Sequence, residues 1–296
     1  MIENIKKLKI GKIIVKPKMS DFTTYKVGGY AKALVYPNSV DSLTKLLKYL
    51  KENNIKHKVI GNGSNLIFKD ELYDGVLIKL TELDNLEISG TTLKVEAGYN
   101  LIKLSMKAAK LGLAGLEFAS GIPGTIGGAV YMNAGAYKSD MGYIVREVKV
   151  LTPSLEIKTL SNKELDFHYR TSFLQKNKDY ICLEATIKLV KGDSKAIMDV
   201  IQDRKKRRLE SQPLEYPSAG SVFRNPEGDY AGRLIEELGY KGKNIGGAYV
   251  SEKHANFIIN KDKATATDVR SLIEEIRKKV KDKYNIDLIV EQEFVD

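Results

Sequence analysis

A segment rich in glycine and alanine in the middle of the chain constrains the possible folds more than any other feature. Residues 121–128 contain four glycines and no charged side chain, and the surrounding stretch 115–143 follows neither the helical nor the strand period. Backbone this bare cannot build a hydrophobic core, but it lets a flat cofactor edge or a pyrophosphate approach closely. A flexible linker would carry Ser, Lys and Glu instead of the Ile, Ala, Val and Met present here. We therefore predict a long loop that contacts a ligand, with at most a short helical turn.

The first glycine loop of the chain, which precedes this second one, follows an expected strand over 58–60 and reads Gly61-Asn62-Gly63-Ser64-Asn65. Its two glycines permit backbone angles that turn successive N–H groups toward one point, and Ser64 and Asn65 add side-chain donors. Such a nest binds phosphate, although an ordinary tight turn explains the same residues. The loop lacks the third glycine of a dinucleotide fingerprint and the Gly-Lys-Ser/Thr of a P-loop, so neither of those sites is predicted.

The net charge of the chain points to anionic partners without choosing among them. The 296 residues carry a formal charge of +10, of which five charges come from the run Arg204-Lys205-Lys206-Arg207-Arg208. This run has no aromatic residues between its cations and the chain has no Trp, so a solvated helix end is a better interpretation than a nucleic-acid surface. We expect no nucleic-acid partner.

Cysteine and histidine are scarce, which limits the chemistry of the chain. A single Cys182 cannot form an internal disulfide, and three His residues do not supply a zinc site, which needs about four Cys or His ligands. No run reaches the roughly 18 to 20 apolar residues of a membrane span, and the first residues lack the apolar stretch of a signal peptide. We expect a cytoplasmic protein with no metal and no membrane insertion.

Apolar periodicity predicts an α+β unit over about 22–193, with strands and few helices. One helix is expected over 40–50 with Ser39 as its cap, and another over 101–111, ending at Gly112. Strands are expected over 58–60, 75–80, 92–97, 145–151, 157–160 and 180–190.

The polar sequence Gly192-Asp193-Ser194 marks a domain boundary in this interpretation. Helices are expected after it, the first around Ile197 to Ile201 and the others over 230–238 and 269–284, the last with Thr265 and Asp268 as a capping pair. Residues 1–20 are interpreted as a helical or frayed lead-in.

Three further segments carry side chains suited to chemistry. Arg170 lies among aromatic residues and offers a planar charged fork for a carboxylate or an enolate, although a surface ion pair is the simpler interpretation. Ser221 lies on backbone constrained by nearby prolines, but without a Gly-x-Ser-x-Gly motif or a close His it indicates no hydrolase triad, and it can be a turn serine. Glu291 and Glu293 alternate, so both are expected on one face of a strand, where carboxylates usually contact solvent.

In their order and spacing these motifs resemble those of the UDP-N-acetylenolpyruvoylglucosamine reductases, the MurB family of peptidoglycan synthesis. The resemblance covers most of the chain, and no single motif carries it. The matching segments are 23–29, both glycine loops, 169–172, Gln212-Pro213, 217–226 and the terminal Glu-x-Glu.

This resemblance implies an α+β fold whose FAD-binding region is of the vanillyl-alcohol-oxidase (PCMH) type, followed by an α+β substrate-binding domain. The implied domains are a lead-in over 1–21, an FAD-binding region over 22–193 with subdomains of about 22–80 and 81–193, a substrate-binding domain over 194–285, and a C-terminal strand over 286–296 that carries the catalytic carboxylate.

The resemblance also implies two cofactors, FAD and NADPH, and the substrate UDP-N-acetylglucosamine enolpyruvate, which is reduced to UDP-N-acetylmuramate. Arg224 and Asn225 are expected to contact the uridine diphosphate part of the substrate. The implied FAD-binding residues are Gly61, Asn62, Gly63, Ser64, Asn65, Gly121, Pro123, Gly124, Thr125, Gly127, Gly128, Asn133 and Gly135.

For catalysis, the resemblance implies that Arg170 and Glu293 stabilise an enol intermediate and that Ser221 donates a proton to the neighbouring carbon. Glu291 remains a rival to Glu293, because the chain departs from the family pattern after the final Glu. The short spacing between Arg170 and Ser221 leaves little room for an inserted tyrosine loop, so the short class of the family is expected. We also expect a monomer. Another FAD-dependent oxidase or dehydrogenase of the same fold is the alternative.

Overall fold

The computed structural model describes all 296 residues, Met1–Asp296. The chain forms two compact units, each assembled from three separate segments. Unit 1 consists of Met1–Val15, Ala33–Asn62 and Gly75–Lys206, and unit 2 consists of Lys16–Lys32, Gly63–Asp74 and Arg207–Asp296. The functional division of the chain into an FAD-binding region and a substrate-binding domain stays a prediction.

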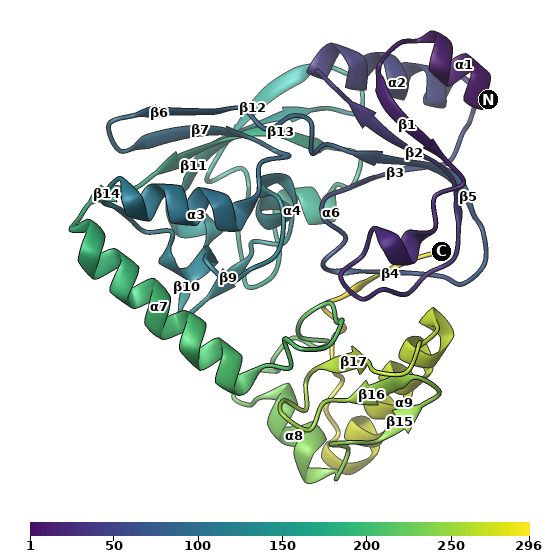
Figure 1. Cartoon of the computed structure of the whole chain (residues 1–296), viewed down its shortest axis with the longest axis vertical. Coiled ribbons are helices and arrows are strands. Elements are labelled where there is room, and N and C mark those ends of the chain that lie inside the picture. The colour runs from purple at the N-terminus through teal and green to yellow at the C-terminus, as the bar shows by residue number, and fades with distance from the viewer. The chain divides into compact units, whose positions relative to one another are not determined.

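The first sheet of the chain has four strands in the order β1-β2-β5-β3, and helices α1 (Ile2–Lys7) and α2 (Val40–Glu52) accompany it (Figure 1). Its strands are β1 (Gly11–Val15), β2 (Ala31–Pro37), β5 (Tyr73–Lys79) and β3 (His57–Ile60). The Ser39 side chain accepts a hydrogen bond from the N–H of Ser42, which confirms the predicted cap of α2. The apolar side of α2 packs into the core of unit 1 with residues of β2 and β5.

The interpretation of 1–20 as a helical or frayed lead-in is right about a helix, α1, but misses a strand. Strand β1 pairs antiparallel with β2 along its whole length, from Gly11 opposite Pro37 to Val15 opposite Ala33. Ile5 and Ile10 are fully buried in the main core of unit 1. The Lys-rich composition of this segment concealed the strand, because its lysines lie at exposed positions around a few buried apolar residues.

The second sheet of unit 1 is antiparallel and has five strands in the order β12-β11-β13-β7-β6. Helix α3 (Leu101–Lys110) lies along it (Figure 1). Its strands are β6 (Leu86–Ser89), β7 (Thr92–Glu96), β11 (Val145–Leu151), β12 (Ile157–Ser161) and β13 (Ile181–Lys188). Shorter elements of unit 1 are β8 (Leu113–Ala114), a 3-10 turn (Glu117–Ala119), β9 (Gly135–Ala136), β10 (Ser139–Asp140), α5 (Met141–Ile144), α6 (Phe173–Lys176) and β14 (Val190–Lys191). Helix α7 (Ser194–Ser211) begins in unit 1 and carries the basic run on its exposed later turns.

The glycine-rich stretch is more ordered than the predicted loop. It contains α4 (Ile126–Tyr131), whose N-terminus is capped by the side chain of Thr125. Ile126, Ala129 and Val130 face the core of unit 1, and α4 packs against β13 and β7. A helix of six residues is too short to show a helical period, and its two glycines reduce the apolar signal further.

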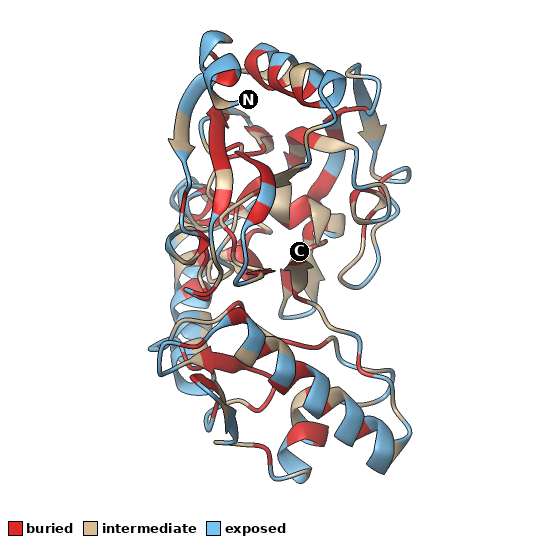
Figure 2. Cartoon of the chain, turned by 90° about the vertical axis from the view of Figure 1, so that its right-hand side faces the viewer, coloured by how far each residue is buried: buried red, intermediate tan, exposed pale blue.

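Unit 2 contains a small antiparallel sheet, β15-β16-β17, that lies against α9 (Figure 1). The buried residues of α9 form one stripe, and Figure 2 shows buried and exposed residues alternating along the helix. The elements of unit 2 are a 3-10 turn (Met19–Asp21), β4 (Leu66–Phe68), α8 (Ala231–Glu237), β15 (Asn244–Ile245), β16 (Ala248–Val250), β17 (Ile258–Asn260), α9 (Ala266–Tyr284) and β18 (Glu293–Val295). Strand β18 pairs in parallel with β4.

Asp70 fixes the beginning of α9, which leads to a stability prediction. Its two carboxylate oxygens accept hydrogen bonds from the N–H groups of Ala266 and Thr267 at 2.8 and 2.9 Å. Replacing Asp70 by Ala leaves these donors without their acceptor, so we expect a loss of about 1–2 kcal/mol in the free energy of unfolding. Urea unfolding measures the loss. Asp70→Asn, which keeps one acceptor, should lose less, and an unchanged midpoint in Asp70→Ala would contradict this role.

Candidate active site

The two glycine loops meet inside unit 1. A Cβ atom added to Gly61 would lie 2.6 Å from the Oγ1 atom of Thr125, which is far closer than two such atoms can approach. A Cβ atom on Gly128 would have only that same oxygen within 4 Å, at 3.6 Å, and would otherwise point into open space. The structure therefore brings Gly61 and Thr125 together, and a length of backbone beside them carries no side chain.

Backbone hydrogen bonds hold the second glycine loop rigidly in this place. The N–H of Ile126 donates to Tyr99 O at 3.0 Å, and the N–H of Gly127 donates to Ala97 O at 2.8 Å. A Cβ on Gly127 would lie 3.1 Å from the Cβ of Ala97, so a larger residue would push the loop away from the end of β7. Gly121, Pro123 and Gly124 form the turn that leads into α4.

The first glycine loop passes from unit 1 to unit 2 between Asn62 and Gly63. Gly63 has a φ of 66°, and a Cβ there would lie 2.5 Å from Phe22 O, so only glycine fits this turn. The Asn65 side chain donates a hydrogen bond to Glu291 O at 3.0 Å. The backbone carbonyl of Asn65 accepts one from the N–H of Glu293 at 2.8 Å. Asn65 therefore holds the C-terminal segment, a use that the sequence did not indicate.

Arg170 lies at the tip of a tight hairpin turn in unit 1. His168 and Thr171 exchange two backbone hydrogen bonds of 3.0 Å, which leaves Tyr169 and Arg170 as the turn residues. Arg170 has a φ of 54°, an uncommon conformation for a residue with a side chain. Its guanidinium lies 5.0 Å from the centre of the Tyr169 ring and donates to Gly135 O at 2.7 Å. Within unit 1 the guanidinium therefore contacts an aromatic ring and a backbone carbonyl.

Asn133 and Gly135 support this turn from the chain segment after α4. The Asn133 side chain donates to His168 O at 2.8 Å and accepts from the N–H of Gly142 at 2.9 Å. Gly135 is buried, and a Cβ there would lie 2.5 Å from the Cβ of Asp140. Both residues were predicted to bind FAD. In unit 1 the Asn133 amide and the Gly135 carbonyl contact the Arg170 turn, and their binding of FAD stays a prediction.

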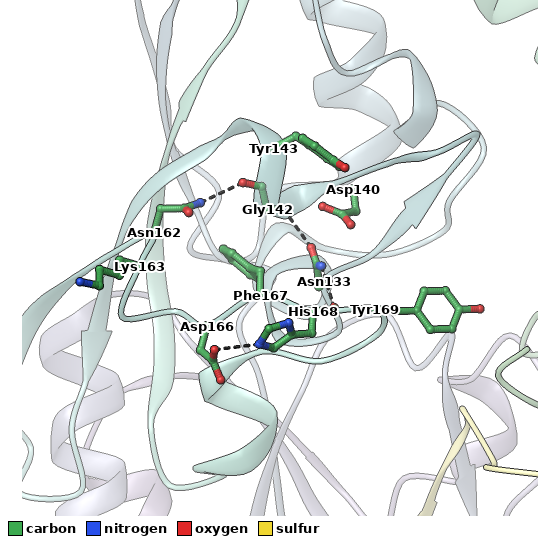
Figure 3. A pocket seen from close by; sticks show the side chains of 10 residues that line it. All are labelled: Asn133, Asp140, Gly142, Tyr143, Asn162, Lys163, Asp166, Phe167, His168 and Tyr169. Carbon is green, nitrogen blue, oxygen red and sulfur yellow. Dashed lines mark hydrogen bonds and ion pairs between the residues drawn. The ribbon is translucent and has the colours of Figure 1, made fainter. Parts of the chain in front are cut away.

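A polar pocket of about 410 Å³ lies beside this turn (Figure 3). Asn133 is the one predicted site residue among those that line it. The lining residues are Asn133, Asp140, Gly142, Tyr143, Asn162, Lys163, Asp166, Phe167, His168 and Tyr169. Tyr169 points away from the other labelled side chains (Figure 3).

Ser221 lies in unit 2 on a segment whose backbone is held on both sides. Gly220 before it has a φ of 75°, and Val222 and Phe223 after it are each 1% exposed. The N–H of Glu291 donates to Val222 O at 2.8 Å, and the N–H of Arg224 donates to Ile289 O at 2.9 Å. The structure therefore brings the Ser221 segment and the C-terminal segment side by side.

The predicted strand over 286–296 is shorter in the structure, and Glu291 lies outside it. Only Glu293–Val295 form a strand, and the chain bends at Gln292, which is 3% exposed. The Gln292 side chain donates to Ala219 O and Gly220 O, both at 3.2 Å. The Gln292 side chain therefore joins the C-terminal segment to the residues directly before Ser221.

The predicted substrate residues Arg224 and Asn225 continue the Ser221 segment toward α8. The Asn225 side chain accepts from the N–H of Ala231, the first residue of α8, at 3.1 Å. Asn225 is exposed and Arg224 is half-buried. Within unit 2 Asn225 therefore has a structural use at the start of this helix, and its contact with substrate stays a prediction.

Cys182 in β13 takes no part in this chemistry. Burial, and to a smaller extent the charge of Glu184, raises the pKa of the thiol to about 12, so it stays neutral. We expect the native protein to resist a thiol-specific reagent at mildly alkaline pH and to react with one equivalent after denaturation. Rapid reaction of the native protein would contradict the burial of this side chain.

Comparison with known proteins identifies the family. Residues 212–295 match the model of the UDP-N-acetylenolpyruvoylglucosamine reductase C-terminal domain, and residues 31–161 match that of an FAD binding domain. A UDP-N-acetylenolpyruvoylglucosamine reductase of Anoxybacillus flavithermus is 47% identical over 294 residues, which cover 99% of this chain and 97% of that relative. The chain belongs to the UDP-N-acetylenolpyruvoylglucosamine reductase family.

Other members of this reductase family agree with the assignment. The reductase of Bacillus subtilis is 44% identical over 296 residues, which cover 100% of this chain and 98% of that relative. The crystal structure of the reductase from Thermus caldophilus superposes with a TM-score of 0.81 at 33% identity, covering 96% of this chain and 98% of that one. The predicted family and its α+β fold with an FAD-binding region are confirmed, and the short class stays a prediction.

The residues present fit the FAD that this family implies. A side chain on Gly61 would collide with Thr125, and one on Gly128 would enter the open space beside the Thr125 hydroxyl. Gly61 thus lets its loop lie against Thr125, and Gly128 keeps the adjacent backbone clear, as the close approach of a flat ring or a pyrophosphate requires. The structure contains no cluster of His, Cys, Asp and Glu that could hold a metal ion, and none of its helices has the length and apolarity that a membrane span requires.

Proposed function

We propose that this chain reduces the enolpyruvyl group of UDP-N-acetylglucosamine enolpyruvate to give UDP-N-acetylmuramate, with FAD bound and NADPH as the reductant. The observation that carries the proposal is the similarity to reductases of this name over almost the whole length of both chains. The meeting of Gly61, Thr125 and Gly128 supports the cofactor, since these residues leave bare backbone in one place.

FAD would be held by the residues of the two glycine loops and by Asn133 and Gly135, as the resemblance implies. When bound, it supplies a hydride acceptor for NADPH and a hydride donor for the terminal vinyl carbon of the enolpyruvyl ether. Within unit 1, Thr125 would serve both loops: its hydroxyl fixes the start of α4 and lies against Gly61.

Ser221 supplies a proton to the carbon next to the one that receives the hydride. An alcohol is a weak acid toward water, but a carbanion conjugated with a carboxylate is basic enough to take its proton. A positioned proton donor of this kind accelerates a reaction by about 10²- to 10⁴-fold. The fixed backbone on both sides of Ser221 supports this role, because proton transfer needs a donor held in one place.

Arg170 and Glu293 stabilise the enolate that hydride addition leaves on the substrate. Arg170 presents a permanently charged fork from a rigid turn, which suits two oxygens of one planar group. Glu293 can assist only as the protonated acid, because a carboxylate has no hydrogen to donate to an enolate oxygen. Glu291 stays the rival for this role, since its backbone contacts the same Ser221 segment.

The cofactor test is direct. The purified protein should be yellow or take up added FAD, and NADPH should bleach its visible absorbance in the absence of oxygen. Protein that stays colourless in the presence of FAD would contradict the proposal. The monomeric state, the cytoplasmic location and the absence of a nucleic-acid partner stay predictions, which sedimentation, cell fractionation and a salt-dependent binding assay would test.

A further inference from the structure

The backbone around Ser221 is held by two buried side-chain amides that no motif indicated. The Gln292 side chain bonds the two residues that precede Ser221 in the chain, and Asn256 bonds the two residues that follow it. Gln292 is 3% exposed and Asn256 is 4% exposed. Both belong to unit 2, as does Ser221.

Gln292 contacts the two residues that precede Ser221. Its Nε2 atom donates to Ala219 O and to Gly220 O, both at 3.2 Å. Two carbonyl oxygens as neighbours fix which end of the amide points toward them, because only the nitrogen can donate. Gly220 has a left-handed φ of 75°, so this amide holds the one residue whose backbone could most easily change conformation.

Asn256 contacts the two residues that follow Ser221. Its backbone oxygen accepts from the N–H of Val222 at 2.9 Å, and its side chain accepts from the N–H of Phe223 at 2.9 Å and donates to Phe223 O at 2.8 Å. Ser221 itself makes no backbone hydrogen bond, so its position depends on these neighbours.

Burying the Gln292 amide costs free energy, and the hydrogen bonds that its nitrogen donates are what the side chain contributes in return. Its Oε1 atom is buried and accepts no hydrogen bond from the protein. An apolar side chain of the same size would fill the space without burying an unsatisfied acceptor. What the amide adds is the pair of donors to Ala219 O and Gly220 O, directly before Ser221.

We propose that Gln292 is a positioning residue for the reaction, and that with Asn256 it holds the Ser221 hydroxyl in the place from which it gives its proton. This inference rests on the proposed function, because it assumes that Ser221 is the proton donor. It assigns to the residue between the two candidate carboxylates a role of its own. Gln292 acts through the backbone of Ser221 and does not touch the substrate.

Gln292→Met tests the proposal, because it keeps the length of the side chain and removes both donors. We expect flavin content and flavin reduction by NADPH to stay near the wild-type level. The reoxidation of reduced flavin by the enolpyruvyl substrate should slow by about ten- to a hundredfold, since a small displacement of a reacting group has effects of this size. Amide hydrogen exchange should rise in the peptide that contains 219–223.

Gln292→Glu gives a pH signature that a loss of packing would not produce. The ionised carboxylate faces two carbonyl oxygens without a hydrogen to donate, whereas the protonated acid restores one donor. Reoxidation by substrate should therefore recover as pH falls in Gln292→Glu but not in Gln292→Met. A pH profile of the same shape in both variants would overturn the positioning role.

Two controls separate the possible failures. Asp70→Ala weakens unit 2 without touching the Ser221 segment, so it should leave reoxidation by substrate unchanged. In a Ser221→Ala background, Gln292→Met should cause little further loss, because both changes remove the same proton transfer. Full additivity, or wild-type reoxidation in Gln292→Met, overturns this inference alone. If the wild-type protein does not pass its electrons to the substrate, the proposed function fails, and the inference fails with it.

Discussion

The variant Ser221→Ala should still accept electrons from NADPH but should fail to pass them on to the enolpyruvyl substrate. The hydroxyl is the proposed proton source for the substrate carbon, and the variant has no other acid on this rigid segment. We expect the rate of reoxidation by substrate to fall by about 10²- to 10⁴-fold. Stopped-flow absorbance under anaerobic conditions measures the two half-reactions separately.

Two matched variants control this result. Ser218→Ala removes a half-buried hydroxyl from the same segment and should leave both half-reactions unchanged. Ser221→Cys keeps a weak acid at the position and should retain part of the activity. An equal loss of both half-reactions in Ser221→Ala would refute the role of proton donor and indicate damage to the fold or to flavin binding.

The variant Arg170→Lys should also lose most of its reoxidation by substrate. Lysine keeps the positive charge, but as a point charge it cannot present two parallel donors to a planar enolate and carboxylate. It also cannot keep the bond to Gly135 O while offering the rest of a fork to a ligand. We expect a loss of about 10²- to 10³-fold in kcat, as is found when one donor to a developing oxyanion is removed.

Arg146→Lys provides the matched control for this variant. Arg146 is an exposed residue of β11 in the same unit, so its replacement should change neither half-reaction. Near-normal turnover in Arg170→Lys would show that charge alone suffices, and the geometry of the Arg170 turn would then have no catalytic purpose.

The sequence predicted those elements that are long enough to show a period or that carry a specific cap. Helix α2 begins after Ser39 as expected, and α9 begins with a capping box in which Thr265 and Asp268 bond each other's backbone. The strands β7 and β11 also lie close to their expected ranges. In each case the local pattern agrees with the packing of the folded unit.

Shorter elements could not be predicted, because their conformation is decided by contacts far away in the sequence. Strands β15, β16 and β17 have two or three residues each, and they form because they pair with one another beside α9. Strand β18 ends up beside β4, from which it is separated by more than two hundred positions in the chain. No local window contains such information.

The candidate site shows the same limit at the level of single residues. Glycine composition pointed correctly to a backbone kept clear around Gly61 and Gly128. It did not indicate that the Asn133 side chain donates a hydrogen bond to the Arg170 turn. It also did not indicate that the Gln292 side chain donates to the backbone carbonyls before Ser221. A polar side chain that forms a hydrogen bond with distant backbone produces no periodic pattern in the sequence.

The reoxidation of reduced protein by substrate distinguishes the proposed reductase from another flavin enzyme of the same fold. FAD-loaded protein is first reduced with one equivalent of NADPH without oxygen, and UDP-N-acetylglucosamine enolpyruvate is then added. We expect rapid return of the oxidised flavin absorbance and formation of one equivalent of UDP-N-acetylmuramate. Flavin that stays reduced after the substrate is added, yet is reoxidised by oxygen or another acceptor, would contradict the proposed function and favour a different oxidase of the same fold.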